Sequence, residues 1–223
     1  MKIFLAVVIS AVIGYLLGSI NSSIIVVKLI KGQDIRTMGS KNAGLTNTLR
    51  CCGKQCALFT LIGDLLKGVA AVILSRIITG AMEAGLPPDN DTHYIGYIAG
   101  LFAILGHVFP IYFGFKGGKG VLVGVSTFIA VDARVFLVLL VIFAIVLTIS
   151  KYVSLASIIS SAMCPFVTFL MARFAGGLST GRSLLYLALS VPMITIVIIM
   201  HRSNIERLKN GTENKFSFGS KNK

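Results

Sequence analysis

The 223-residue sequence has little charge. Only 13% of its residues are Asp, Glu, Lys or Arg, against about 25% in soluble globular proteins, while 55% are apolar and the mean hydropathy is +0.88. Acidic residues are scarcest, with 8 against 21 Lys and Arg and a formal net charge of +13. This composition excludes a water-soluble enzyme and a disordered chain, because the apolar residues far exceed what one core of this size could bury. It predicts a polytopic membrane protein.

Cysteine is also scarce. Cys51, Cys52 and Cys56 lie within six residues beside basic groups, and Cys164 lies in an apolar stretch. This spacing excludes a secreted disulfide scaffold, and we expect reduced thiols. Because the first three cysteines lack a fourth nearby ligand, we predict no metal site.

Long uncharged runs dominate the rest of the chain, and a bilayer crossing needs roughly 20 such residues. We predict an all-α polytopic bundle of about seven transmembrane helices, or five if the shorter pieces are re-entrant. The first run is too long for a signal peptide and lacks a cleavage site. With no repeat or second domain, residues 1–208 form one transmembrane domain, and the polar tail at 209–223 should be frayed. The predicted helices are residues 3–27, 55–82, 94–113, 121–131, 135–150, 153–172 and 183–200.

The cations are distributed asymmetrically between the loops. Six of the 21 lie in residues 28–54, two in 114–120, one at 151 and six in 201–223. The opposite side holds five, together with Glu83, Asp89, Asp91 and Asp132. Because Lys and Arg concentrate in cytoplasmic loops, we predict an amino terminus outside the cell and a cytoplasmic carboxyl terminus.

Residues 39–50 read Gly-Ser-Lys-Asn-Ala-Gly-Leu-Thr-Asn-Thr-Leu-Arg, and we expect a loop there. Glycines let backbone N–H groups converge on an anion, and hydroxyl, amide and guanidinium donors complete its shell. Membrane loops are often rich in Gly, Ser and Asn, so an anion site and a solvated turn fit this pattern about equally.

Residues 114–120 read Gly-Phe-Lys-Gly-Gly-Lys-Gly and directly precede a predicted helix. A phosphate there would meet a helix N-terminus and a lysine together. The segment is not a P-loop, because Lys119 is followed by Gly120 instead of Ser or Thr. Nucleotide hydrolysis therefore gets little support, and positive-inside lysines on a flexible turn explain the segment equally well.

Polar residues also mark the helices. His201, Asn204 and Arg207 are three residues apart in turn and can share one helical face, although a lone interfacial histidine often only anchors a helix end. Asp64 and Lys67 lie inside a predicted span and should pair in the bundle interior. His107 leads into the 114–120 loop and could orient it.

On the predicted cytoplasmic face these segments describe a site for a phosphorylated compound beside lipid. The sequence resembles the bacterial PlsY family, membrane acyl-phosphate:glycerol-3-phosphate acyltransferases. The likeness covers residues 39–50, Gly-His-Val-Phe-Pro with Phe-Lys-Gly-Gly-Lys-Gly-Val at 106–121, Lys-Tyr-Val-Ser-Leu-Ala-Ser-Ile at 151–158 and His-Arg-Ser-Asn-Ile-Glu-Arg-Leu at 201–208. It departs from the family at Lys41, where Gly is usual, and at Leu45, where Ala is usual.

The resemblance implies transfer of a fatty acyl group from acyl phosphate to the 1-hydroxyl of sn-glycerol 3-phosphate, giving lysophosphatidic acid and phosphate for phospholipid synthesis. The enzyme would lie in the bacterial cytoplasmic membrane with its active site facing the cytoplasm. The resemblance implies no cofactor, no metal, no CoA or acyl carrier protein and no nucleic acid partner.

The resemblance also implies a catalytic group and a substrate-binding group. The catalytic residues would be Ser40, Ser154, His201 and Asn204, and the substrate-binding residues Arg50, Lys119 or Lys116, Gly118, Asn42, Thr46 and Asn47. We assign Arg50 and Lys119 to phosphates, the two serines to phosphate or carbonyl oxygens, and His201 with Asn204 to the acceptor. Asn42, Thr46 and Asn47 would support the loop.

Two alternatives to this function remain open from the sequence. A transporter for phosphorylated metabolites fits broken helices and basic loops, but transporters commonly show paired repeats with a midplane site. An acyl-enzyme on serine would need an acid to orient His201. Glu206 lies about 140° from His201 around a helix, and Asp64 should pair with Lys67, so we expect direct transfer.

Overall fold

The computed structural model describes residues 2–83 and 93–216, which contain helices, turns and loops but no strand. The predicted all-α polytopic bundle is confirmed. In the described residues six segments are long and apolar enough to cross a membrane, and a shorter apolar helix at Val121–Val131 makes a seventh. The acids predicted on the outer side at 89 and 91 lie outside the described residues.

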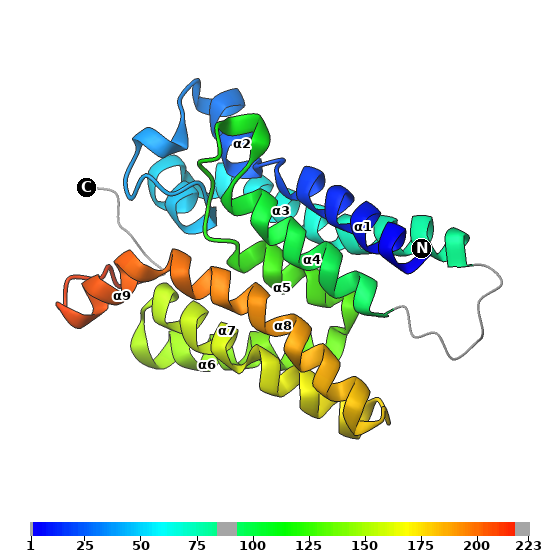
Figure 1. Ribbon diagram of the computed structural model, residues 1–223. Helices are drawn as coiled ribbons and strands as arrows, with labels where there is room; N and C mark the ends of the chain where they lie inside the picture. Colours follow the sequence, from blue (N-terminus) through cyan, green and yellow to red (C-terminus); the bar gives the residue numbers. More distant parts are fainter. Residues whose placement is uncertain (1, 84–92, 217–223) are drawn as a thin grey trace. The chain divides into compact units, whose positions relative to one another are not determined.

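The chain divides into two compact units, Met1–Ala133 and Arg134–Lys223 (Figure 1). The helices of the first unit are α1 (Lys2–Gly18), α2 (Ser22–Lys31), the 3-10 turn η1 (Ile35–Thr37), α3 (Leu45–Glu83), α4 (His93–Val108), the 3-10 turn η2 (Ile111–Phe113) and α5 (Val121–Val131). After these come α6 (Ala133–Ser150), α7 (Val153–Leu170), the π-helical turn η3 (Met171–Ala175), α8 (Thr180–Met200) and α9 (Arg202–Lys209).

Helices α1 and α4 run side by side with their backbones in direct contact (Figure 1). A methyl group added at Gly14 would overlap the carbonyl oxygen of Ala99, and one at Gly18 would overlap that of Ala103. Helices in lipid gain little from hiding apolar side chains, so they associate where small residues let backbones approach. The close approach at Gly14 and Gly18 therefore accounts for the packing of α1 against α4.

The first predicted span lies within Lys2–Lys31, which is long and apolar enough to cross a membrane, but it is formed by two helices, which corrects the expectation of one helix over 3–27. Helix α1 ends at Gly18 and α2 starts at Ser22, where the side chain of Asn21 accepts a hydrogen bond from the Ile24 N–H at 3.2 Å. An asparagine cap of this kind satisfies an otherwise unpaired donor of a helix start. The Asn21 cap thus marks where a second helix begins within the uncharged run.

The expected loop over residues 39–50 is also shorter than predicted. Helix α3 begins at Leu45, and Gly53 breaks its regular backbone with φ 84° and ψ −177°. The segment before that break carries Cys52, which joins a buried apolar cluster with Ile24, Val27 and Ile35. Burial of Cys52 in this cluster accounts for a helix at a position where the polar composition indicates a loop.

The second unit contains α6 to α9. Helix α6 buries only Val135 and Leu139 of its 18 residues, so most of its apolar surface suits lipid. Helix α8 ends at Met200 as predicted, but His201 (φ −94°, ψ 5°) separates it from α9. The expected continuous face through residues 201–207 therefore starts at a helix junction.

Candidate functional site

The segment from Met38 to Gly44, here called the first loop, is organised by one buried amide. Asn47 is 2% exposed and lies on the first turn of α3. Its Oδ1 accepts a hydrogen bond from the Ser40 N–H at 3.0 Å, and its Nδ2 donates to the carbonyls of Met38 at 3.0 Å and Asn42 at 3.1 Å. One side chain thus fixes the loop backbone at three points.

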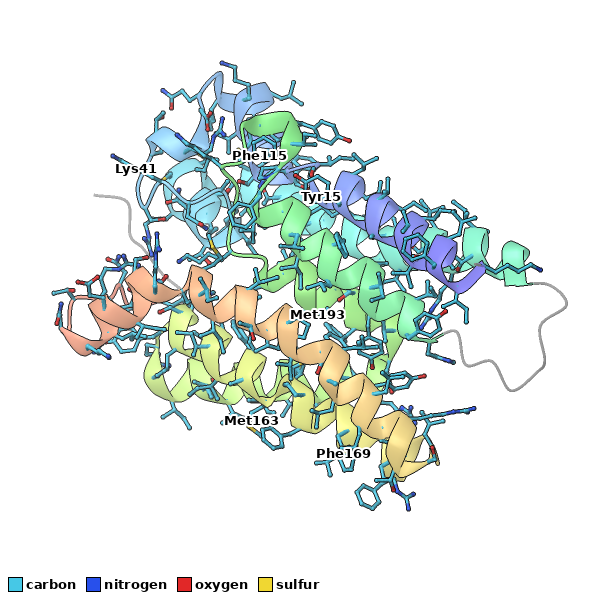
Figure 2. The ribbon with its side chains drawn as sticks, in the orientation of Figure 1. Tyr15, Lys41, Phe115, Met163, Phe169 and Met193 are labelled. Atoms are coloured by element: carbon cyan, nitrogen blue, oxygen red, sulfur yellow. The ribbon has the colours of Figure 1, made fainter. Side chains whose placement is uncertain are left out.

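The predicted ligands on this segment are open to solvent. Ser40 lies on the first loop, and Thr46 and Arg50 lie on the helix that follows; all three are exposed. The backbone of Lys41 has φ 58° and lies in the left-handed region. Residues other than glycine and asparagine rarely adopt this conformation. Figure 2 shows Lys41 on this loop at one end of the first unit.

Residues Gly114–Gly120, here called the second loop, fold back against the end of α4. The N–H groups of Gly117 and Gly118 donate to the carbonyls of Val108 and His107, both at 3.1 Å. A methyl group at Gly118 would overlap His107 Nε2 on one side and the Ala43 carbonyl on the other. The second loop is therefore packed between α4 and the first loop, and only glycine fits there.

A buried charge pair lies beneath the second loop. Lys67 Nζ is 2.9 Å from Asp64 Oδ1, so the predicted pair is confirmed, and it also donates to the Ile20 carbonyl at 2.9 Å. The third contact of Lys67 is His107 Nδ1 at 2.9 Å. Because an ammonium group has only donors, Nδ1 accepts, and the proton of the neutral ring lies on Nε2, which faces Gly118. His107 thereby joins the buried pair to the second loop.

The two candidate lysines differ in their surroundings. Lys116 is exposed, whereas Lys119 is partly buried and directly precedes Gly120, the N-terminal cap of α5. The first turn of a helix offers unpaired N–H groups and a positive dipole end. Of the two lysines, Lys119 is the one next to a helix start, and its role as a phosphate ligand stays a prediction.

The second unit contains a polar cluster around an acid, Glu213, that was not among the predicted site residues. Glu213 accepts hydrogen bonds from Ser154 Oγ at 3.0 Å, Asn204 Nδ2 at 2.8 Å and Arg207 Nε at 2.7 Å. Burial opposes ionisation of this carboxyl, but the three donors outweigh it and hold its pKa below the usual range. Glu213 is therefore an anion at neutral pH.

The tail as far as Phe216 is folded back, so the expectation of a frayed tail is wrong for these residues. The Phe216 N–H donates to the Lys151 carbonyl at 2.6 Å, and Lys215 lies 5.9 Å from the centre of the Tyr152 ring. A turn at Gly211, with φ 69°, begins this return. The signal in the sequence was an acid placed just after that glycine in an otherwise basic tail.

His201 is buried at the junction of α8 and α9. Its Nδ1 lies 2.7 Å from the Val197 carbonyl, which can only accept, so Nδ1 carries a proton and the lone pair of the neutral ring lies on Nε2. The carbonyl, and not Glu213, fixes this tautomer. Although an acid lies in this cluster, it does not complete a Ser-His-acid arrangement through Nδ1.

The candidate residues fall into two groups, one in each unit. Ser40, Asn42, Thr46, Asn47, Arg50, Lys116, Gly118 and Lys119 belong to the two loops and the start of α3, and Ser154, His201 and Asn204 belong to the second unit. Within the described ranges, no three His, Cys, Asp or Glu residues are grouped to hold a metal ion.

The chain is similar in sequence to known proteins of one family. Residues 8–211 match the sequence profile of the family described as glycerol-3-phosphate acyltransferase. The chain is 41% identical over 215 residues to a glycerol-3-phosphate acyltransferase of Clostridioides difficile (strain 630), covering 96% of this chain and 97% of the relative. It is 39% identical over 236 residues to one of Chlorobaculum tepidum (strain ATCC 49652 / DSM 12025 / NBRC 103806 / TLS), covering 100% of both.

Two solved structures are also similar. Both are crystal structures of PlsY (YgiH), an integral membrane glycerol 3-phosphate acyltransferase. Its glycerol 3-phosphate form matches with a TM-score of 0.77 and 32% identity over 95% of this chain and 96% of that chain. Its lysophosphatidic acid form matches with a TM-score of 0.74 and 30% identity over 95% of both chains.

Proposed function

The chain belongs to the glycerol-3-phosphate acyltransferase family, and from that premise we propose that it moves a fatty acyl group from an acyl phosphate to the sn-1 hydroxyl of glycerol 3-phosphate. The products are lysophosphatidic acid and inorganic phosphate, and the reaction serves phospholipid synthesis in the bacterial cytoplasmic membrane. Neither CoA nor acyl carrier protein takes part in the transfer.

The observation that carries the proposal is the pair of packed loops in the first unit. Both substrates carry phosphate, and phosphate is bound best by charged donors and oriented N–H groups. Ser40 on the first loop, Arg50 on α3 and Lys119 before α5 supply hydroxyl, guanidinium and ammonium donors. Arg50 and Lys119 bind phosphate oxygens in this proposal, and Ser40 donates to a phosphate or carbonyl oxygen.

His201, Asn204 and Ser154 have roles at the acceptor. The neutral His201 ring with its lone pair on Nε2 can accept the proton of the attacking hydroxyl, which is the chemistry that a histidine supplies near neutral pH. Asn204 and Ser154 bind Glu213 in the structure and are oriented by it. We assign them to holding the acceptor beside His201.

The transfer proceeds in one step. The glycerol hydroxyl oxygen bonds to the acyl carbon, the bond from that carbon to the phosphate oxygen breaks, and the electron pair leaves with inorganic phosphate. The hydroxyl proton passes to a phosphate oxygen or to His201. Because an acyl phosphate is already an activated anhydride, the protein needs mainly to position both substrates and neutralise their charge.

The identity of the acyl donor distinguishes this reaction from related acyl transfers. Purified protein in detergent should convert glycerol 3-phosphate and palmitoyl phosphate to lysophosphatidic acid, measured by mass spectrometry. Palmitoyl-CoA and palmitoyl-acyl carrier protein should give no product above a protein-free control. Product from palmitoyl-CoA with none from palmitoyl phosphate would refute the proposed donor.

The proposed orientation has the amino terminus outside and the two loops in the cytoplasm. Cysteines introduced at Lys41 and Asn210 should react with an impermeant maleimide only in inverted vesicles. One at Asn90, which lies outside the described residues, should react only in intact cells. Labelling of Lys41→Cys and Asn90→Cys from the same side would contradict the orientation that the cation asymmetry predicts.

A further inference from the structure

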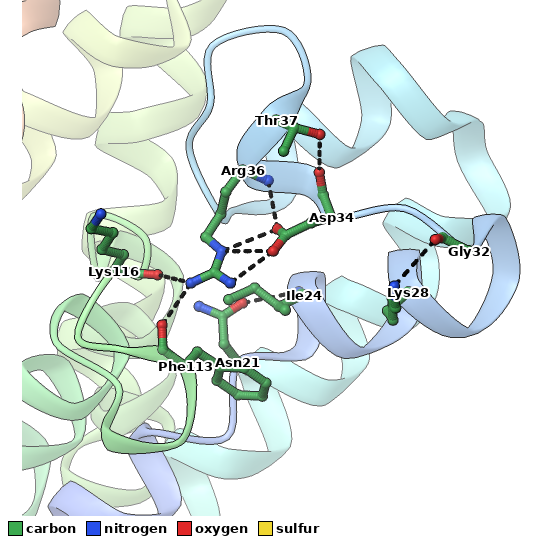
Figure 3. Close-up of polar contacts among 9 residues, drawn as sticks. All are labelled: Asn21, Ile24, Lys28, Gly32, Asp34, Arg36, Thr37, Phe113 and Lys116. Carbon is green, nitrogen blue, oxygen red and sulfur yellow. Dashed lines mark hydrogen bonds and ion pairs between the residues drawn. The ribbon is translucent and has the colours of Figure 1, made fainter.

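Arg36 lies in η1, just before the first loop, and reaches across to the second loop (Figure 3). Its Nη1 donates to the Phe113 carbonyl at 2.6 Å and the Lys116 carbonyl at 3.2 Å. These carbonyls flank the turn at Gly114 and Phe115, whose φ values of 66° and 58° are both left-handed. One guanidinium nitrogen therefore ties together the two ends of the turn that leads into Gly117–Lys119.

Asp34 holds the guanidinium in place. Arg36 Nε contacts both carboxylate oxygens at 3.0 and 3.1 Å, and Nη2 contacts Oδ2 at 2.7 Å. Asp34 Oδ1 also accepts the Arg36 backbone N–H at 2.9 Å, so the carboxylate itself is fixed. The hydrogen bond from Arg36 holds the pKa of the Asp34 carboxyl below its usual range, and it stays ionised at neutral pH.

This arrangement leaves Arg36 little capacity to bind a ligand. Of the five N–H bonds of a guanidinium, one on Nε, two on Nη1 and one on Nη2 have protein acceptors. Asp34 also balances its charge. The side chains of Arg36 and Asp34 are 26% and 32% exposed, and partly exposed ion pairs contribute little to overall stability. Neither phosphate binding nor bulk stability explains the contact.

The contact instead connects two structures that the site requires. Arg36 adjoins the backbone that Asn47 fixes, since Asn47 Nδ2 also lies 3.4 Å from the Ile35 carbonyl. On the other side it fixes the turn that precedes Lys119. We propose that Arg36 is a positioning residue for the transfer: it locks the second loop to the first and so sets where Lys119 lies relative to Ser40. This inference rests on the proposed function, because it takes both loops as phosphate-binding.

The test compares steady-state kinetics of wild-type protein, Arg36→Gln, Arg36→Lys and Asp34→Asn. A lysine keeps the charge but cannot contact two carbonyls and a carboxylate in one plane. We expect Arg36→Gln and Arg36→Lys to raise KM for glycerol 3-phosphate at least tenfold with a smaller fall in kcat, and Asp34→Asn to raise it less. Lys54→Gln, at an exposed cation of the same unit, is the control and should behave as wild type.

A double-mutant comparison separates positioning from general disruption. If Arg36 acts through Lys119, Arg36→Gln added to Lys119→Ala should lower kcat/KM by less than threefold beyond Lys119→Ala alone. Multiplicative losses would overturn the proposal, as would wild-type kinetics of Arg36→Lys with a defective Arg36→Gln, because charge alone would then matter. If Arg36→Gln does not fold, the KM values of Arg36→Lys and Asp34→Asn for glycerol 3-phosphate still test the proposal. Wild-type protein that makes no lysophosphatidic acid would refute the proposed function and this inference with it.

Discussion

Glu213→Gln should release the folded-back tail of the second unit. If the glutamine oxygen still accepts from Ser154 and Asn204, the amide NH2 faces Arg207 Nε, which is 2.7 Å from the carboxylate in the native protein. If the oxygen faces Arg207 instead, it is neutral and the NH2 faces the Asn204 donor. The loss of one charge-assisted hydrogen bond is worth about 1.5 to 3 kcal/mol. Because Arg207 is 36% exposed, water compensates part of this, and we expect about 2 kcal/mol.

Hydrogen exchange of the Phe216 amide reports this release, since that N–H donates to the Lys151 carbonyl. A loss of about 2 kcal/mol corresponds to a roughly 30-fold increase in the rate of exchange through local opening. Deuterium uptake of peptides covering this amide can be followed by mass spectrometry in detergent. Glu206→Gln, at an exposed acid on α9, is the matched control. Unchanged exchange in Glu213→Gln would refute the idea that the carboxylate holds the tail.

Acidification should act as the substitution does. The pKa of Glu213 is lowered from its ordinary value of 4.5, so its stabilisation is complete above that pH and is lost as pH falls through the lowered folded-state value. Exchange of the Phe216 amide, corrected for intrinsic rates, should rise below pH 4.5. Glu213→Gln should lack this dependence; the same acid dependence in the variant would assign it to another group.

Three further predictions concern the two loops and the start of α3. Arg50→Ala should lower kcat/KM by about 10-fold to 150-fold, as expected for one charge-assisted bond, and Arg50→Lys should recover little of it; near-normal Arg50→Lys would mean that charge alone suffices. Lys41→Gly should raise the free energy of unfolding by about 0.5 to 1 kcal/mol, because relief of left-handed strain exceeds the entropy cost of glycine; a lower thermal midpoint in detergent would contradict this. Gly118→Ala should abolish product formation, and adding His107→Ala should not restore it, because the Ala43 carbonyl still blocks the methyl group; restored activity would place the conflict at the histidine ring alone.

The positions of the helices were largely predictable, because a helix that crosses the bilayer needs an uncharged run of about 20 residues. Helix α5 at Val121–Val131 and the end of α8 at Met200 match the prediction. The interruptions did not follow from hydropathy, since each depends on one residue: Asn21 caps a new helix, and Gly53 breaks the start of α3. Composition also misplaced the start of α3, because the apolar face that favours helix there is buried by residues distant in sequence.

The candidate site could be predicted as a set of residue types but not as an arrangement. Glycines and donors near Ser40 and Lys119 were visible in the sequence, whereas the contact of Arg36 with the Phe113 carbonyl spans 77 positions. The return of Glu213 to Ser154 likewise joins residues 59 positions apart. The left-handed backbone of Lys41, with φ 58°, is a conformation that glycine adopts without steric cost, which fits the glycine that the family resemblance leads us to expect there.

The central claim is direct transfer of the acyl group between two phosphorylated substrates, and acyl phosphate with a radiolabelled acyl chain tests it most directly. Incubated with the protein alone and then denatured, it should leave no label on the polypeptide. Addition of glycerol 3-phosphate to a parallel sample should give labelled lysophosphatidic acid and inorganic phosphate in a one-to-one ratio. Stoichiometric label on the protein that moves into product when glycerol 3-phosphate is added, and that disappears in Ser40→Ala or Ser154→Ala, would contradict direct transfer.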